Sequence, residues 1–522
     1  MKKYLFVLFM VVAGIMPATA QSGEDSFEEF RKQMHGDFES FRKRVNEDYA
    51  NFLEGVWKQY NAFRDDRQFV DPKPQEQPKA PVDYRANPDS FTMPNQDVAP
   101  EGERGQSENQ PPKSEKELQL PPTTPPTPLT PPTRDVLPEV VAPPASEDMP
   151  ETEAPRRDVL NKRYMYHSLV YEVPYMSWGD LPEGVAQKEF AQLWKAYSAR
   201  GIERDILPYL QQTAVDCRFN DWFFFDLVRS YVDSEMRSMS AGQRISLTHY
   251  LMAHAGYDVR IGITTDGVPL LMVAIEQDLF ARAYLKVDGE KFYIFYDNQT
   301  ANRSGGNSFY TCEIPSDVDC GKSLDIVIRQ EPIVPYKAHS YSFTYGGIHI
   351  EGEINANLMP MLYRYPQMGV RYYAESVISE SVERDVAQQI AAQISSLPKL
   401  EAVNKLLQFV QRGFSYATDD AQHGFEKPYF FEEMLYYPKC DCEDRSIFYS
   451  YLLREVLDVE NHLIRYPGHE SVAVNLGVKI NGDGYSYQGK NFYISDPTYI
   501  GAVTGMAMEN CRSVRPEIDY IR

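Results

Sequence analysis

A proline-rich segment separates an N-terminal part of this chain of 522 residues from a long globular part. Between Asp71 and Arg157 lie 21 of the 37 prolines, including the run PPTTPPTPLTPP from Pro121 to Pro132. Proline donates no backbone hydrogen bond, and large apolar residues are sparse here, so the segment cannot form a core. We expect residues 67–158 to be a disordered linker, partly in polyproline II conformation, that serves as a spacer or docks a proline-binding partner.

The segment before this linker carries a regular apolar pattern. Its large apolar residues recur at steps of three and four that repeat every 11 residues: Phe27, Phe30, Met34, Phe38, Phe41, Val45, Tyr49, Phe52, Val56, Tyr60 and Phe63. This spacing predicts one long amphipathic helix over residues 22–66, with a slight right-handed coiled-coil drift. Such a stripe needs a partner. The candidates are the rest of this chain, a second copy that associates through residues 27–63, and another envelope protein.

The N-terminus has the pattern of an export signal. In MKKYLFVLFMVVAGIMPATAQS, two lysines precede an apolar run, and an A-x-A cleavage motif ends at Ala20. We therefore expect residues 1–20 to be a signal peptide cut near Ala20, and the mature protein to be periplasmic or secreted. No later stretch is apolar for long enough to cross a bilayer, so we expect no transmembrane segment.

The net charge and the cysteine content argue against two classes of protein. The formal net charge of −22 argues against non-specific nucleic-acid binding, which needs clustered Lys and Arg to neutralise phosphates. Six cysteines are too few for a disulfide scaffold in a chain of this length. Cys312 and Cys320, close together in a polar loop, are the best local candidates for a pair.

The rest of the chain predicts an α+β fold with an internal duplication. ISLTHYLMAHAGYDVRIGI, from Ile245, and SIFYSYLLREVLDVENHLI, from Ser446, share a helix-then-strand pattern. Three collinear matches between the two regions have offsets of 201, 199 and 200 residues. We expect a first copy over 159–330, a β-rich connecting region over 331–394 and a second copy over 395–522.

The stretch KCDCEDRSIFYSYLL carries the most specific chemical signal. Asp441 can cap the following helix with Asp444 three residues on, which puts Cys442 in the first helical turn. The positive end of a helix dipole stabilises a thiolate there and lowers its pKa. His469 opens the next predicted strand but one, and Asp496 ends a later strand before a proline.

These three residues form a set that suits nucleophilic catalysis. Cys442 would be the nucleophile and His469 the base, and Asp496 would orient the histidine. At the matching positions the first copy has Ala241, Leu270 or a neighbour, and Tyr296, so it lacks the cysteine and the histidine.

Other readings of the cysteines stay open. Cys440, Cys442 and His469 could suggest zinc, but the second ligand pair of a structural zinc site is missing. Cys440 could also form a disulfide with Cys442 or Cys511, and a bond to Cys442 would silence the thiol. We expect no metal and no organic cofactor, since no Gly-rich phosphate loop lies between a strand and a helix.

Together, CDCEDRSIFYSYLLRE, PGHESVAV and NFYISDPTYIG resemble the transglutaminase-like cysteine hydrolase superfamily. The resemblance covers about 130 residues from Leu397 and implies a papain-like core with Cys442, His469 and Asp496 as its triad. Family members often carry glycine where this chain has Cys440, and an aromatic residue close behind the histidine, where Glu470 stands. The earlier copy looks like the degenerate companion domain of some exported bacterial members.

The expected function follows from this resemblance. It implies an exported thiol hydrolase that cleaves amide bonds of a peptide, protein or cell-wall peptide through a thioester at Cys442. Two alternatives remain: a catalytically silent binding or scaffold protein of the same fold, and a transglutaminase that passes the acyl group to an amine.

Overall fold

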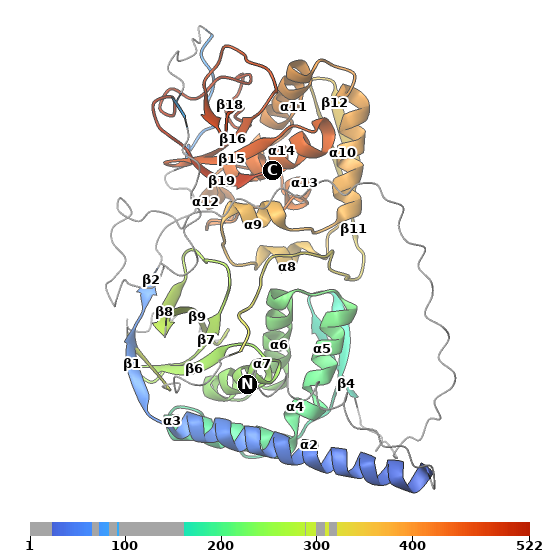
Figure 1. Ribbon diagram of the computed structural model, residues 1–522, viewed down its shortest axis with the longest axis vertical. Coiled ribbons are helices and arrows are strands. Elements are labelled where there is room, and N and C mark those ends of the chain that lie inside the picture. Colours follow the sequence, from blue (N-terminus) through green and yellow to red (C-terminus); the bar gives the residue numbers. More distant parts are fainter. Residues whose placement is uncertain are drawn as a thin grey trace.

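The computed structural model describes residues 23–64, 73–82, 91–92, 161–287, 289–298, 308–312 and 321–522. It confirms a mixed α+β architecture, with two mostly antiparallel sheets that each pack against helices (Figure 1). The expected signal peptide, residues 1–20, and Cys320 lie outside the described residues. No helix in the described part of the chain is both long and apolar enough to span a membrane.

The first unit combines helices with a seven-stranded sheet of order β1-β10-β6-β7-β9-β8-β2. A hairpin of β4 and β5 precedes the helices. Its elements are β4 (Asn161–Tyr166), β5 (Leu169–Pro174), α3 (Gln187–Arg200), α4 (Ile202–Asp205), α5 (Leu207–Asp216), α6 (Asp221–Glu235), α7 (Ala241–His254), β6 (Val259–Thr264), β7 (Pro269–Ala274), β8 (Ala283–Val287), β9 (Glu290–Tyr296) and β10 (Ser308–Cys312).

The second unit has a six-stranded sheet of order β19-β15-β16-β18-β17-β3. Helix α14 packs against β15 and β16 of this sheet, and α11 packs against α14. The elements are α11 (Lys399–Gly413), β13 (Ser415–Tyr416), α12 (Asp419–Gln422), α13 (Glu433–Tyr436), β14 (Lys439–Cys440), α14 (Cys442–Leu457), β15 (Asn461–Tyr466), β16 (His469–Val474), β17 (Gly484–Tyr487), β18 (Lys490–Ile494) and β19 (Glu517–Ile521).

The connecting region, 331–394, is less rich in strands than predicted. One hairpin, β11 (Ala338–Tyr345) and β12 (Ile348–Asn355), is followed by the helices α8 (Met359–Tyr363), α9 (Val370–Glu375) and α10 (Glu380–Ile394). In α10 the apolar residues Val386, Ile390 and Ile394 are buried at helical spacing, and α10 packs against α14 and β12. That spacing favours a helix over a strand.

The two units share one order of elements. In each, a helix (α7 or α14) precedes an antiparallel strand pair (β6 and β7, or β15 and β16), which a further strand (β9 or β18) joins. The flanking strands also correspond, β10 to β19 and β8 to β17. This likeness supports the predicted duplication, which remains a prediction about the history of the chain.

The N-terminal helix is shorter than the predicted 22–66. Helix α2 (Gly23–Glu54) ends before Gly55, because glycine is among the poorest helix formers. The chain continues as β1 (Trp57–Asn61) and β2 (Phe63–Arg64), which pair with β10 and β8 at the two edges of the first sheet. Open sheet edges offer unpaired backbone groups. The residues that were predicted to end the helix therefore pair there as strands.

The apolar stripe of α2 packs on this chain over its C-terminal half. Leu53 is buried, and the Tyr49 ring stacks on Trp194 of α3 at a centroid distance of 3.9 Å. Further towards the N-terminus, Met34 and Phe38 are about half exposed, at 49% and 53%. Self-association through residues 27–63 therefore stays a prediction that concerns this outer half.

Part of the predicted disordered linker, 67–158, is instead ordered on the second unit. Within 73–82, the backbone N–H of Ala80 donates to the Ile500 carbonyl at 2.9 Å, and Ile500 N–H donates to the Pro78 carbonyl at 2.8 Å. Strand β3 (Phe91–Thr92) pairs in parallel with β17. An extended, proline-rich backbone still has free carbonyls and some free N–H groups, so it can add to an exposed strand.

The packing of α2 gives a stability test. Leu53→Ala removes a buried side chain, so it should lower the free energy of unfolding by about 2–5 kcal/mol. Met34→Ala, on the exposed half of the same helix, should change it by less than about 0.5 kcal/mol. Urea unfolding of the full chain measures both. Equal losses in the two variants would contradict the packing described here.

Candidate active site

Cys442 is the first residue of α14, as predicted. The backbone N–H of Asp441 donates to Asp444 Oδ2 at 3.0 Å, the capping geometry that the sequence indicated. Unlike most helix starts, this turn is fully buried: Cys442, Glu443, Asp444 and Arg445 are each 0% exposed. Every charge in the turn therefore needs a partner within the protein.

His469 and Asp496 form a direct pair at the sheet. His469 begins β16, and its Nε2 lies 2.7 Å from Asp496 Oδ2. The other carboxylate oxygen of Asp496 accepts the backbone N–H groups of Thr498 and Tyr499, at 2.8 and 3.2 Å. The carboxylate is thus held in one orientation by the turn after β18. Within the part of the chain that the structure describes, the second ring nitrogen of His469, Nδ1, is buried and has no hydrogen-bond partner.

The thiol lies beside the start of β16. The backbone N–H of Glu470, the residue after His469, hydrogen-bonds the Cys442 sulfur and favours its thiolate. Cys442 Sγ also donates to Glu443 Oε2 at 3.2 Å. The structure therefore joins His469 to Asp496 directly and brings Cys442 against the backbone next to that histidine.

The electrostatics differ from the sequence prediction. Burial raises the pKa of the Cys442 thiol well above its ordinary value, and the Glu443 and Asp441 carboxylates add to this shift. Lys73 and the Glu470 N–H lower the pKa, but by less. The prediction of a lowered pKa counted the helix dipole alone. That prediction was wrong because burial and the neighbouring carboxylates both favour the neutral thiol.

A buried ion cluster beside the thiol was not predicted. Lys73, from the ordered part of the linker, is 8% exposed and points its ammonium into a group of acids. Lys73 Nζ lies 2.6 Å from Glu426 Oε1, 2.9 Å from Asp441 Oδ2 and 3.6 Å from Asp419 Oδ2, and it also pairs with Glu443. The oxygens of Asp419, Asp441 and Glu443 all lie within 4.8 Å of one another, the spacing of a set that can hold a cation.

Two further side chains support this region. Tyr416, whose pKa is raised by burial and then by the neighbouring Cys442, donates its hydroxyl to the Pro74 carbonyl. Gln411 is fully buried and donates to the carbonyls of Asp496 and Ala502 at 3.0 and 3.1 Å. Neither residue carries a recognisable motif, since each is defined by contacts far along the chain.

The other readings of the cysteines find no geometric support. Cys440, Cys442 and Cys511 are unpaired thiols, so the two disulfides considered for Cys440 are not formed. Cys440 Sγ accepts from Arg445 Nε at 3.3 Å and donates to the Ser415 carbonyl at 3.5 Å. Among the residues that the structure describes, Cys440, Cys442 and His469 do not gather as a metal-binding group.

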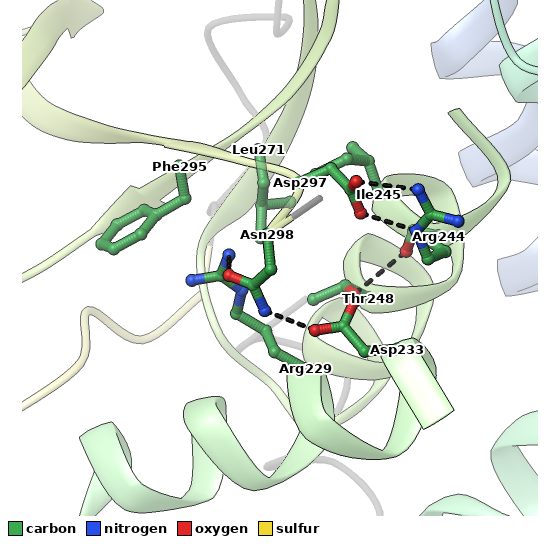
Figure 2. A pocket seen from close by; sticks show the side chains of 9 residues that line it. All are labelled: Arg229, Asp233, Arg244, Ile245, Thr248, Leu271, Phe295, Asp297 and Asn298. Atoms are coloured by element: carbon green, nitrogen blue, oxygen red, sulfur yellow. Dashed lines mark hydrogen bonds and ion pairs between the residues drawn. The ribbon is translucent and has the colours of Figure 1, made fainter. Parts of the chain in front are cut away.

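The matching place in the first unit holds a small polar pocket. Figure 2 shows Arg244 of α7 facing Asp297, with Arg244 Nε and Nη2 at 2.7 and 2.8 Å from the carboxylate oxygens. Arg229, Asp233, Thr248 and Asn298 complete the polar lining, and the cavity has a volume of about 10 Å³, room for about one water. Ala241 begins α7 where Cys442 begins α14, so this pocket offers no nucleophile of that kind.

No family model matches this chain, and no curated protein matches it significantly.

The ion cluster predicts a pH dependence of stability. Burial raises the pKa of the Asp419 carboxyl to about 7 from 3.8, and Lys73 opposes the shift. The unfolded chain loses this proton before the folded chain does. The contribution of Asp419 to the free energy of unfolding is therefore fully present below about pH 4 and is lost as the pH rises to about 7.

Removing the titrating group should flatten this part of the curve. Between pH 4 and 7, Asp419→Asn should reduce the fall in unfolding free energy by up to about 1.4 kcal/mol per pH unit. The exposed neighbour provides the control, since Asp420→Asn should run parallel to the parent protein. Urea unfolding at several pH values measures the slopes. Identical slopes in all three proteins would contradict the placement of Asp419.

Proposed function

We propose that this chain is an exported thiol hydrolase of the transglutaminase-like superfamily, which cleaves an amide bond through a thioester at Cys442. One observation carries the proposal. Within the described residues, the buried His469–Asp496 pair leaves Nδ1 of the histidine without a partner, and the Cys442 sulfur lies against the backbone of the next residue. A histidine whose one ring nitrogen is held by a carboxylate keeps the other for accepting a proton.

The proposed reaction has two stages. In the first, the Cys442 thiol passes its proton to His469 Nδ1 while the sulfur bonds to the carbonyl carbon of the substrate. His469 then returns that proton to the amine nitrogen as the C–N bond breaks, and a thioester remains. Asp496 keeps Nε2 protonated, so that Nδ1 is the nitrogen free to accept.

In the second stage water resolves the thioester. His469 takes a proton from the water as its oxygen attacks the carbonyl carbon, and the C–S bond breaks to give a carboxylic acid and the free thiol. Transfer to an amine in place of water would form a new amide. Peptide or cell-wall-peptide hydrolysis is the activity that we propose.

The burial of Cys442 sets a requirement for the proposed catalysis. Cys442 is 0% exposed and its proton is directed to Glu443, so a substrate must first open the site. The same burial favours a second candidate function, a silent scaffold in which the thiol is only part of the core. The two differ in whether changing Cys442 alters any chemistry.

Amide hydrolysis by matched cysteine variants tests the proposal. The mature full-length protein is incubated with a mixture of unmodified peptides, and newly formed primary amines are quantified. Cys442→Ala should abolish their release, whereas Cys217→Ala, which removes a buried thiol from the first unit, should retain it. His469→Ala should lower the rate about 10²- to 10⁴-fold.

The same assay distinguishes the silent scaffold. If parent protein and Cys442→Ala release equal amounts of amine, and both unfold at the same temperature, the hydrolase proposal is wrong. Circular dichroism of each variant ensures that a lost activity is not a lost fold.

A further inference from the structure

Lys73 is an unusual lysine because its ammonium is buried in another part of the fold. It is the only buried residue of the ordered stretch 73–82, whose other side chains are exposed or half-buried. All of its ion-pair partners belong to the second unit: Asp419, Glu426, Asp441 and Glu443. We call these four carboxylates the acidic cup.

The acidic cup has more carboxyl groups than its occupant can neutralise. Asp419, Asp441 and Glu443 are buried and the Glu426 side chain is 9% exposed, so unpaired charges among them are costly. Protons are retained there: burial, and then Glu443, raise the pKa of Glu426 to about 10. Within the described residues, Asp441 Oδ1 is fully buried and accepts no hydrogen bond. The cup therefore has an acceptor oxygen that Lys73 leaves unused.

The acidic cup adjoins the candidate nucleophile. Glu443 directs one carboxylate oxygen, Oε1, to the Lys73 ammonium and the other, Oε2, to the Cys442 sulfur at 3.2 Å. One carboxylate thus separates the ammonium from the thiol. A ligand held in the cup lies beside any group bound to that sulfur.

The attachment of the occupant suits exchange. Apart from Lys73, the stretch 73–82 is held by polar contacts at its own backbone and at Gln77, whose Nε2 donates to the Gln411 carbonyl at 2.9 Å. Its exposed residues include Gln75, Glu76 and Lys79. Ala80 packs against the core of the second unit, whereas Lys73 is the residue of this stretch whose side chain enters the acidic cup. A competing ammonium therefore needs to displace only the lysine side chain and not the whole stretch.

We propose that the acidic cup is a binding subsite for a primary ammonium group, which Lys73 occupies as an internal ligand. An ammonium offers three donors on a compact cation, and the cup presents acceptor oxygens from four directions. A substrate with a lysine-like side chain near its scissile amide displaces Lys73 and places that amide at Cys442. The assignment to substrate rests on the proposed hydrolase function, whereas the preference for an ammonium does not.

Chemical rescue of a missing lysine tests the subsite without any turnover. Lys73→Ala removes Cγ, Cδ, Cε and the ammonium, a fragment that n-propylammonium, with three carbons and one ammonium, matches. We expect this variant to unfold at a lower temperature than the parent protein. n-Propylammonium chloride should restore its Tm in a saturable manner by about 3 °C or more relative to equal sodium chloride.

Matched variants and probes make the rescue specific. Lys73→Met fills the space without a charge, so n-propylammonium should not raise its Tm. Lys79→Ala, from an exposed lysine of the same stretch, should behave as the parent. n-Propanol should not rescue Lys73→Ala, since it lacks the cation. If Lys73→Ala is insoluble, the yield of folded protein in n-propylammonium against n-propanol gives the same comparison.

Two results would overturn the proposal. One is no rescue by n-propylammonium beyond that of sodium chloride or n-propanol. The other is rescue by Mg²⁺ or Ca²⁺ but not by n-propylammonium, which would make the cup a metal site. Neither result depends on hydrolysis. An inactive protein whose Lys73→Ala variant is rescued would refute the enzyme proposal and retain the ammonium subsite.

Discussion

The first turn of α14 is charged and yet wholly buried, and much of the second unit is arranged around its four side chains. Arg445 donates to the carbonyls of Gln411 and Phe414 at 3.1 and 2.9 Å, which fixes the end of α11 against α14. Asp444 accepts the backbone N–H of Tyr429 at 2.8 Å and so anchors the loop before α13. Glu443 pairs with Lys73 and thereby holds the stretch 73–82. When one partner of a buried ion pair is lost, the other charge stays buried and unpaired, which is strongly destabilising. These contacts therefore favour one arrangement of the surrounding chain.

The first unit covers the same helix start with backbone, where the second unit uses a charged side chain. At the start of α7, where the second unit has Glu443, it has Gly242, offset by the same 201 residues as Ala241 and Cys442. A Cβ atom on Gly242 would lie 2.1 Å from the Gly184 carbonyl oxygen, so the backbone of residues 183–184 fills the space. In both units a segment from earlier in the chain covers the first turn of this helix, and both keep a buried arginine at its fourth position, Arg244 or Arg445. In the second unit the covering contact is the Lys73 side chain.

Local patterns in the sequence predicted the parts of the site that local physics determines. The cap at Asp441 and the strand that His469 opens each depend on a few neighbouring residues, and both occur. The predicted strand end at Asp496 was two residues late, since β18 ends at Ile494 and Asp496 begins the turn that follows. The partnership of Lys73 with Asp441 spans 368 positions, so no periodicity or spacing indicates it. The raised pKa of the Cys442 thiol was missed for the same reason, because burial and neighbouring carboxylates come from tertiary structure. The predicted end of α2 was wrong for a different reason. The apolar repeat continues past Gly55, but the residues beyond it pair as strands with the open edges of the first sheet.

Trapping an acyl group on the protein would decide whether Cys442 is a nucleophile. The full-length protein is mixed with p-nitrophenyl acetate at neutral pH, quenched in acid and mapped by peptide mass spectrometry. We predict an acetyl group on Cys442 that hydroxylamine removes, and that persists longer in His469→Ala because deacylation needs the base. Acetyl groups spread over lysines, with none on Cys442 at any time, would contradict a thioester mechanism and leave the buried thiol as part of the core.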